Sequence, residues 1–407
     1  MLDYVGARIR ELRAARGMSQ ADLGVLLFVH RDLVRKIETA ERVPSADFLT
    51  RCDQVLEAHG ALARLVPVVE RERVLRAVRA DQTSEVAFRS SATDRPVLDW
   101  LLADSAGQQS AVDNDITAEA ARELEDLRDR DHAEGAGATY PDVEGALRGR
   151  LTTLATTAPQ IATGMLELAG YEAVDLGVDG LAQQHYLRAL DLMTRTGNHV
   201  YGGYLIAVSL AHLALHCGDE QQALRLATAG LRGTGDRATP AVRAAFRTVQ
   251  ARAYARRRDE SACATALLRA EADLARSNRA DEPYWIGYFG EADFADEKAH
   301  CFFDLGLYGL TRRETRTALT LLSTDRVRRI GIDTALQASA LARGGELDEA
   351  CSVARRAIDH MGGLASFRAG HRIVLMLAEL QPYAHLPQVR DVIEYADATL
   401  GPLLNPG

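Results

Sequence analysis

The sequence predicts an all-α protein in which a small N-terminal helical unit precedes a long array of helices. Three observations support this prediction. Alanine, leucine and arginine dominate the composition, which favours helices along most of the chain. Residues 1–65 show helical apolar spacing that is bounded by helix-capping residues. From about residue 141 onward, helix follows helix with a weak repeat of roughly 40 residues.

The length and composition are those of a folded protein with more than one domain. A chain of 407 residues exceeds what one compact core usually serves. Hydrophobic residues make up 47% and charged residues 26%, which is ordinary for a globular protein. No run of about 18 apolar residues is present, and the segment MLDYVGARIRELRAARG lacks the apolar core of a signal peptide. We therefore expect a cytoplasmic protein that does not contact a membrane.

Charge divides the chain into three parts. Residues 1–80 hold 14 Lys and Arg against 11 Asp and Glu, whereas residues 81–140 hold 5 against 14. The whole chain has a net charge of -9. Within the acidic part, RPVLDWLL is a short apolar island that we expect to dock as a helix on a neighbouring domain. The predicted organisation is an N-terminal unit over residues 1–70, an acidic, partly ordered linker over residues 71–140, and a helical body over residues 141–407.

The sequence indicates neither a metal site, nor a cofactor, nor a catalytic centre. The five cysteines lie far apart without a CxxC pair, which favours free thiols over a disulfide frame or a zinc site. His212 and His216 are four residues apart, but no third ligand is evident. No phosphate-binding glycine loop, GxSxG elbow, HExxH motif or paired-carboxylate signature is found. We predict that the protein is not an enzyme.

Caps and stops define the helices of the N-terminal unit. A first helix ends at Gly17, and Ser19 can cap a second helix. A third helix is expected from about Arg31 to Glu38. The pair Pro44-Ser45 opens a fourth helix, and a fifth is expected to follow.

The third helix has one apolar face and one polar face. Val34 and Ile37, three residues apart, are expected to face the core. The residues that then face outward or obliquely are Arg31, Asp32, Leu33, Arg35 and Lys36.

These outward residues have the chemistry for contacts with DNA. In two helices joined by a tight turn, the second helix can enter the major groove and present its first turns to base edges. Arg31 or Lys36 can bond guanine, Asp32 can accept from cytosine, and Leu33 can touch a thymine methyl group. Gln20, at the start of the second helix, is placed to contact a backbone phosphate. Arginines on the first helix (Arg8, Arg10, Arg13 and Arg16) also suggested phosphate contacts.

Residues 5–58 resemble the Cro and phage-repressor (XRE) helix-turn-helix family. The resemblance rests on VGARIRELRAARGMSQADL, VHRDLVRKIE and ERVPS. It implies a five-helix domain that binds double-stranded DNA, with an ion pair between Arg13 and Glu38 that braces the first and third helices. It also implies Gln20 as the phosphate contact and, as base readers, Arg31, Asp32, Leu33 and Lys36.

The sequence departs from this family at three positions. The turn residue, usually glycine, is Phe28, which must either avoid positive φ or carry strain. The cap of the third helix, usually Ser or Thr, is His30, which we expect to be weaker by about 1 kcal/mol. The third position of that helix, usually polar, is Leu33. Few polar readers and a modest charge predict weak binding by one subunit, so we expect a homodimer on two half-sites.

The body resembles tetratricopeptide (TPR) solenoids, whose stacked helix pairs leave a concave surface. Turns of the repeat are expected at Gly177, Gly218, Asp259, Gly306 and Gly345. An irregular all-helical bundle is the alternative. The chain as a whole, including DRPVLDWLL and GLAQQHYLRALDL, resembles actinobacterial regulators that join a helix-turn-helix to a TPR-like body.

An aromatic excess in DEPYWIGYFGEADFADEKAHCFFDLG marks a candidate ligand groove. Aromatic residues are only 6% of the chain, so the cluster stands out. Two interpretations remain open, a ligand pocket or a hydrophobic knot between helix pairs. The candidate groove residues are Tyr204, Tyr284, Trp285, Tyr288, Phe289, Asp293, Glu297 and His300.

Two functions are consistent with the sequence. The first is a nucleoid-associated, sequence-specific transcription regulator whose body senses a peptide, a small molecule or a protein partner. The second is a protein-interaction scaffold that retains the helix-turn-helix mainly for dimerisation.

Overall fold

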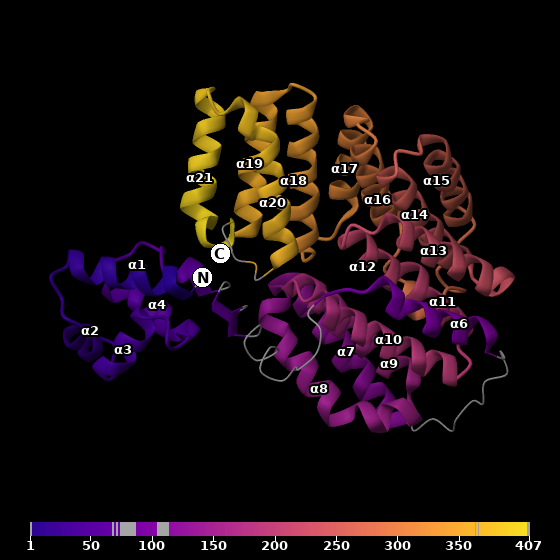
Figure 1. Ribbon diagram of the computed structural model, residues 1–407, viewed down its shortest axis with the longest axis horizontal. Coiled ribbons are helices and arrows are strands. Elements are labelled where there is room, and N and C mark those ends of the chain that lie inside the picture. The colour runs from indigo at the N-terminus through magenta and orange to yellow at the C-terminus, as the bar shows by residue number, and fades with distance from the viewer. Residues whose placement is uncertain are drawn as a thin grey trace.

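The computed structural model describes residues 2–66, 69–70, 72–73, 87–103, 114–362, 364 and 366–404. Over these residues the protein is helical and contains no strand, as the sequence predicts. Figure 1 shows a small N-terminal group of helices, here called the head (residues 2–66), beside a larger helical body (residues 114–404). None of the described helices combines the length and apolarity that crossing a bilayer requires.

The head packs four α-helices and one 3₁₀-helix around a single core. Its core includes Ile9, Leu23, Val34 and Leu49, all fully buried. Ile37 is buried beside Val34, which confirms the expected inner face of the third helix. The elements are α1 (Leu2–Ala15), α2 (Gln20–Leu26), α3 (Arg31–Glu38), α4 (Ala46–Val55) and η1 (Ala63–Leu65). Residues 69–70 and 72–73 are also helical, and the rest of the expected fifth helix lies outside the described residues.

Polar side chains fix the ends of the head helices. Ser19 and Asp22 form a reciprocal capping box at α2, and Ser45 accepts from the amide of Phe48 at α4. The carboxylate of Asp53 accepts three backbone N–H groups from the loop that leads into η1. Burial alone would raise the pKa of Asp53, but these three donors lower it overall.

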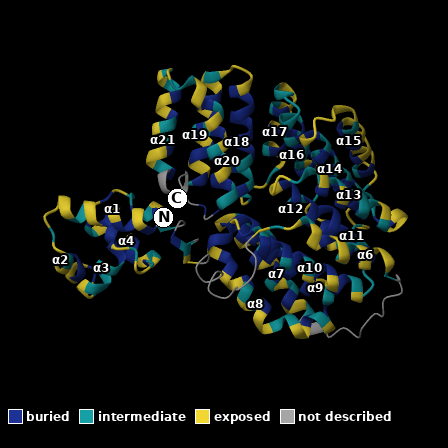
Figure 2. Cartoon of the chain, in the orientation of Figure 1, coloured by how far each residue is buried: buried dark blue, intermediate teal, exposed yellow. Residues whose placement is uncertain are grey.

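The body is an array of helices that pack mainly against their neighbours in the chain, as in α9 with α10, α14 with α15 and α18 with α19. Figure 2 shows buried residues where these helices meet and exposed residues along their outer faces. The elements before the middle of the body are α7 (Asn114–Glu134), α8 (Ala136–Thr157), α9 (Pro159–Leu176), α10 (Asp179–Arg195), α11 (His199–Tyr204), the π-helical η3 (Leu205–Leu210), α12 (Ala211–His216), α13 (Glu220–Thr234) and η4 (Gly235–Arg237). They are followed by α14 (Pro240–Arg256), α15 (Glu260–Leu274), η5 (Tyr284–Ile286), α16 (Glu291–Asp304), α17 (Tyr308–Leu321), α18 (Val327–Arg343), α19 (Leu347–Met361), α20 (Phe367–Leu380), η6 (Gln381–Tyr383) and α21 (Pro387–Leu404).

The turns of the repeat use left-handed backbone. Gly177, Gly218, Gly306 and Gly345 have φ between 75° and 81°, a region that glycine enters without a steric penalty. At the third turn the left-handed residue is Arg258, with φ of 60°, and the adjacent Asp259 caps α15. The predicted turns therefore do join successive helices.

The predicted acidic linker is wrong over residues 114–140. This stretch forms α7 and the beginning of α8, and Ala120 and Leu124 are buried in the main core of the body. Several of its acidic residues are paired, since Arg150 contacts both Glu119 and Glu123. Residues 74–86 and 104–113 of the predicted linker lie outside the described residues.

The short apolar island forms a helix that docks on the body. This helix, α6 (Asp94–Leu102), follows η2 (Ser90–Thr93) and places Trp100 in a slot lined by Gly202, Gly203 and Gly233. A Cβ at Gly233 would lie 2.3 Å from the indole ring, so no larger residue fits there without displacement. The indole also stacks on the ring of His199 at 4.2 Å and donates to its backbone carbonyl.

A buried ion cluster, here called the closing cluster, joins the first and last parts of the body. The guanidinium of Arg328 on α18 donates to Asp131 of α7 at 2.6 Å and to Asp175 of α9 at 3.1 Å. Asp175 also accepts from Ser366 and pairs with Arg368 of α20. All three members of the central pairing, Arg328, Asp131 and Asp175, are almost completely buried. The cluster therefore holds α7 and α9 against α18 and α20.

Replacing Trp100 with alanine is expected to destabilise the body by about 3–5 kcal/mol, because it empties the glycine slot and removes the indole hydrogen bond. Urea unfolding of the full chain, followed by circular dichroism, would measure the change. The matched control is Leu102→Ala on the exposed side of the same helix, expected to change stability by less than about 0.5 kcal/mol. Equal effects of the two changes would contradict the docking role of Trp100.

Acid is expected to weaken the body through His185. Burial, followed by the charge of Arg188, lowers the pKa of this histidine to about 4. The folded state therefore favours the neutral ring. This preference contributes to the free energy of unfolding above about pH 6.5, and the contribution is lost as the pH falls toward 4. The stability difference between the wild type and His185→Gln should shrink by about 1.4 kcal/mol between pH 7.5 and pH 5.5. Urea unfolding at both pH values tests this, and an unchanged difference would contradict it.

Candidate nucleic-acid interface

The turn between α2 and α3 places a residue other than glycine at positive φ. Phe28 adopts φ of 56°, so the aromatic residue takes the left-handed conformation that the resemblance reserves for glycine. Its side chain is 90% exposed and gains little from burial in return. The turn is closed by the amide of Val29, which donates to the carbonyl of Gly24 at 2.8 Å. Phe28 therefore carries backbone strain that burial of its ring does not offset.

His30 caps α3 through its side chain. Its backbone is extended, and its Nδ1 accepts a hydrogen bond from the amide of Asp32 at 3.2 Å. This bond satisfies one of the free amide groups at the helix start, as a serine or threonine would. The imidazole thus replaces the expected hydroxyl.

A buried carboxylate braces the head. Arg13 donates to both oxygens of Glu38, at 2.6 and 3.0 Å, so that α1 and α3 are joined by a two-pronged ion pair. Gln20 donates to the same carboxylate at 2.7 Å, and Arg10 donates to the backbone carbonyl of Glu38. One N–H of the Gln20 amide is therefore used inside the head, and the other is left for a contact outside it.

Arg8 of α1 and Arg16, just after its end, also have partners within the head. Arg8 pairs with Glu11, and Arg16 pairs with Glu57. These arginines are therefore paired within the head, and the predicted phosphate contacts are not needed to account for their presence.

The predicted reading residues lie on the outer surface of α3, but most of their charge is paired. Asp32 contacts both Arg35 at 3.2 Å and Lys36 at 2.9 Å. Those bonds, first from Lys36 and then from Arg35, lower the pKa of Asp32. Arg35 is also held by Glu41 at 2.6 Å. Arg31 is exposed and has neither a hydrogen bond nor an ion pair within the described residues.

Leu33 lies differently from the other predicted readers. It is half-buried and packs against the core of the head. Figure 1 shows α2 and α3 at the edge of the head that is turned away from α21, the body helix that lies against η1. The surface around Arg31 is thus accessible, and Leu33 can offer only one edge of its side chain.

Comparison with known protein families agrees with this geometry. Residues 5–66 match the family model of a helix-turn-helix domain. Comparison of the chain with curated proteins gave no match. The N-terminal part of this chain is therefore a helix-turn-helix domain, and such a domain suggests a DNA-binding regulator.

The predicted groove residues come together in the body, but they fill the space between helices. Trp285 is buried and stacks on Tyr201 with ring centroids 4.5 Å apart. Tyr204 is also buried, and its hydroxyl lies 2.9 Å from that of Tyr288. Phe289 packs edge-on against Tyr288. Tyr284 and Tyr288 remain exposed, so the cluster has a packed base and an aromatic rim.

The polar groove residues are held in ion pairs. Glu297 contacts Arg252 at 2.6 Å and His212 at 3.2 Å, and Asp293 lies 3.7 Å from Arg329. Burial alone would raise the pKa of Glu297, but Arg252 and His212 hold it well below its usual range. A separate cavity of about 430 Å³ is lined by residues of α8, α9 and α10, mainly leucines and the alkyl parts of longer side chains. None of the candidate groove residues lines this cavity.

Sequence reasoning missed the charged residues of the body interior. Arg328, Arg329, Asp175, Asp296 and Asp333 are all buried or in buried ion pairs. Their one local signal is a charged residue inside an apolar helix, as in AGYEAVDLG. Their partners lie as many as 197 positions away, and no local pattern names them.

Replacing Phe28 with glycine is expected to stabilise the head by about 0.5–1 kcal/mol, since glycine enters the left-handed region without strain. Hydrogen exchange of the amides in α2 and α3 would measure this gain without interference from the body. Phe28→Ala is the matched control, because alanine removes the same ring and keeps the strain. A gain of equal size with alanine would show that the exposed ring, not the backbone, is unfavourable.

Proposed function

We propose that this protein is a sequence-specific transcription regulator of the XRE type that binds DNA as a homodimer. The observation that carries the proposal is the exposed outer face of α3, which is braced from behind by Arg13 and Glu38 and carries the unpaired Arg31. A rigid, accessible helix with a free guanidinium suits the major groove, where arginine recognises guanine with two bonds.

The dimer is supported by the limited positive charge of one head. Asp32 and Glu41 neutralise much of the charge of Arg35 and Lys36, so few phosphates can be engaged by one subunit. Two heads on half-sites about one helical turn apart would double the contacts. Under this proposal Gln20 contacts a phosphate with its remaining N–H, and Arg31, Asp32, Leu33, Arg35 and Lys36 lie in the groove.

The body would act by binding rather than by catalysis. Its TPR-like array of helix pairs and its aromatic rim around Tyr284 and Tyr288 suit a peptide, a small molecule or a protein partner. Such an effector would change DNA binding only if it preferred one arrangement of the two heads over another. The proposed location is the cytoplasm, at the nucleoid.

Replacing Arg31 with alanine is expected to weaken specific binding by about 10- to 100-fold, because it removes the free guanidinium from the reading face. Electrophoretic mobility shifts on genomic fragments near the protein's own gene, at several salt concentrations, would measure the loss.

In the same assay Asp32→Asn is expected to tighten binding to non-specific DNA by a few-fold. That change removes a negative charge and releases Lys36 for phosphates, whereas Arg35 stays paired with Glu41.

The matched control is Arg8→Ala, because Arg8 is another surface arginine of the head that is paired locally with Glu11. It is expected to leave binding unchanged within about twofold. Absence of any salt-sensitive, sequence-dependent shift by the wild type would count against the regulator.

The scaffold alternative is favoured by one feature. Val25, Leu26 and Phe28 are exposed together at the end of α2, which is unusual for a surface that meets only water and DNA. Under this alternative the head pairs through that apolar patch and the body captures a partner protein. A variant with Arg31, Arg35 and Lys36 all changed to alanine separates the two functions. A regulator would lose DNA binding with its fold intact, whereas a scaffold would capture its partner protein as the wild type does.

A further inference from the structure

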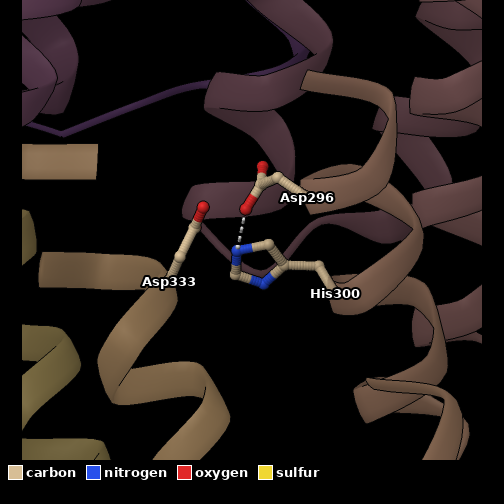
Figure 3. Close-up of side chains that lie close together, drawn as sticks. All are labelled: Asp296, His300 and Asp333. Carbon is tan, nitrogen blue, oxygen red and sulfur yellow. Dashed lines mark ion pairs between the residues drawn. The ribbon is translucent and has the colours of Figure 1, made fainter. Parts of the chain in front are cut away.

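Three potential metal ligands converge between α16 and α18. Asp296 and His300 lie one turn apart on α16, with Oδ1 of the carboxylate 3.5 Å from Nε2 of the ring. Asp333 of α18 points toward both of them, as Figure 3 shows. One ligand atom from each residue lies within 4.8 Å of the other two. A carboxylate, an imidazole and a second carboxylate thus surround one point.

The carboxylate oxygens at this point lack hydrogen-bond donors. Asp333 is fully buried, and neither of its oxygens accepts a hydrogen bond from the described residues. Oδ1 of Asp296 is likewise unsatisfied, although Oδ2 of the same group accepts from Arg329 at 2.5 Å. Buried carboxylates without donors are strongly unfavourable. One positively charged group within reach of all three oxygens would remove this unfavourable free energy.

The surrounding charges do not supply that partner in full. Arg329 is the guanidinium in contact with the cluster, and it faces three carboxylates, those of Asp293, Asp296 and Asp333. Its Nε lies 3.6 Å from Asp333, which is too far for a hydrogen bond. Arg326 adds positive charge near Asp293, but its own guanidinium donates to His132. With both carboxyl groups ionised, negative charge would therefore be in excess at Asp296 and Asp333.

We propose that Asp296, His300 and Asp333 form a binding site for one divalent transition-metal cation. Two carboxylates and one imidazole suit Zn²⁺ or Mn²⁺ better than Ca²⁺ or Mg²⁺, which prefer oxygen ligands alone. Zn²⁺ fits best, because it accepts three protein ligands with one further position. Binding requires the ligand atoms to approach to roughly 3.3 Å of one another, which side-chain rotation can provide.

His300 is suited to the role of nitrogen ligand. Its Nε2 lies 3.5 Å from Oδ1 of Asp296, and a neutral imidazole can coordinate a metal through this nitrogen. Its side chain is 21% exposed, whereas Asp333 is fully buried. The site goes beyond the proposed DNA-binding function and does not depend on it.

The competing occupant is a proton. Burial, with the adjacent charge of Asp296 second, raises the pKa of Asp333 well above its usual range. A proton shared by the two carboxyl groups would also relieve their repulsion. The two occupants differ in a measurable way, because a proton needs neither His300 nor a metal.

The test is metal titration of the full chain after treatment with a chelator. Isothermal titration at pH 7 should show one equivalent of Zn²⁺ bound, with Mn²⁺ bound more weakly, and Zn²⁺ should raise the thermal midpoint. His300→Ala and Asp333→Asn should each weaken Zn²⁺ binding at least about 100-fold. His300→Ala alters a partly exposed residue and keeps the fold testable if Asp333→Asn does not fold.

The matched control is His216→Ala. His216 lies 3.5 Å from Asp179, the same separation as in the candidate site, but it belongs to no group of three ligands found among the described residues. This variant should keep wild-type affinity for Zn²⁺. The proposal is overturned if the wild type binds no stoichiometric Zn²⁺, or if both site variants bind it as the wild type does. If the wild type binds no metal and the Asp333→Asn variant is more stable than the wild type, the occupant of the site is a proton.

Discussion

The body depends on how the positive charge of Arg328 is buried. Moving a guanidinium out of water is costly unless carboxylates meet it with good geometry, and here Asp131 and Asp175 do so from α7 and α9. Burial would raise the pKa of Asp175, but Arg328 and Arg368 hold it below its usual value, so the pairing is ionic. These partners lie more than 150 positions before Arg328 in the chain. Because the charge of Arg328 is compensated only when both regions are in place, the closing cluster links the folding of α18 to that of α7 and α9.

Arg329, the next residue of α18, also brings a charge into the interior, where acidic residues of another helix pair with it. Arg329 faces α16 and pairs with Asp296, whereas Arg328 faces α7 and α9. Two adjacent arginines thus tie one helix to two different groups of acids. Any change of charge at Asp296 or Asp333, whether by a cation or a proton, acts on the helix that also closes the body. Such a change shifts the conformation only to the extent that one arrangement of α18 holds the ligand better than another.

The sequence predicted what local rules control and failed where distant residues decide. Caps, stops and apolar spacing predicted the four head helices, and α3 begins and ends at the predicted residues. The acidic residues of the stretch 114–140 predict a solvent-exposed linker, yet Asp131 is buried against Arg328. The candidate aromatic residues do meet, but the sequence could not tell a packed base such as Trp285 from an open rim such as Tyr284. His30 shows a further limit, because the resemblance supplied a preferred residue and not the range of side chains that can cap.

The route from body to head runs through the last helices. α20 carries Arg368 of the closing cluster and packs on α21, and α21 in turn lies against η1 of the head. The loop before η1 is fixed by the carboxylate of Asp53 on α4, so a displacement of α21 would reach a rigid part of the head and not a yielding one. Contiguity alone does not amount to coupling, which requires two arrangements that a ligand distinguishes. The closing cluster is where such arrangements would differ most in energy, since parting Asp175 from Arg368 and Arg328 leaves buried charges without partners. Coupling of the body to the head through α21 would therefore require a ligand that binds the body better with this cluster intact than with it parted.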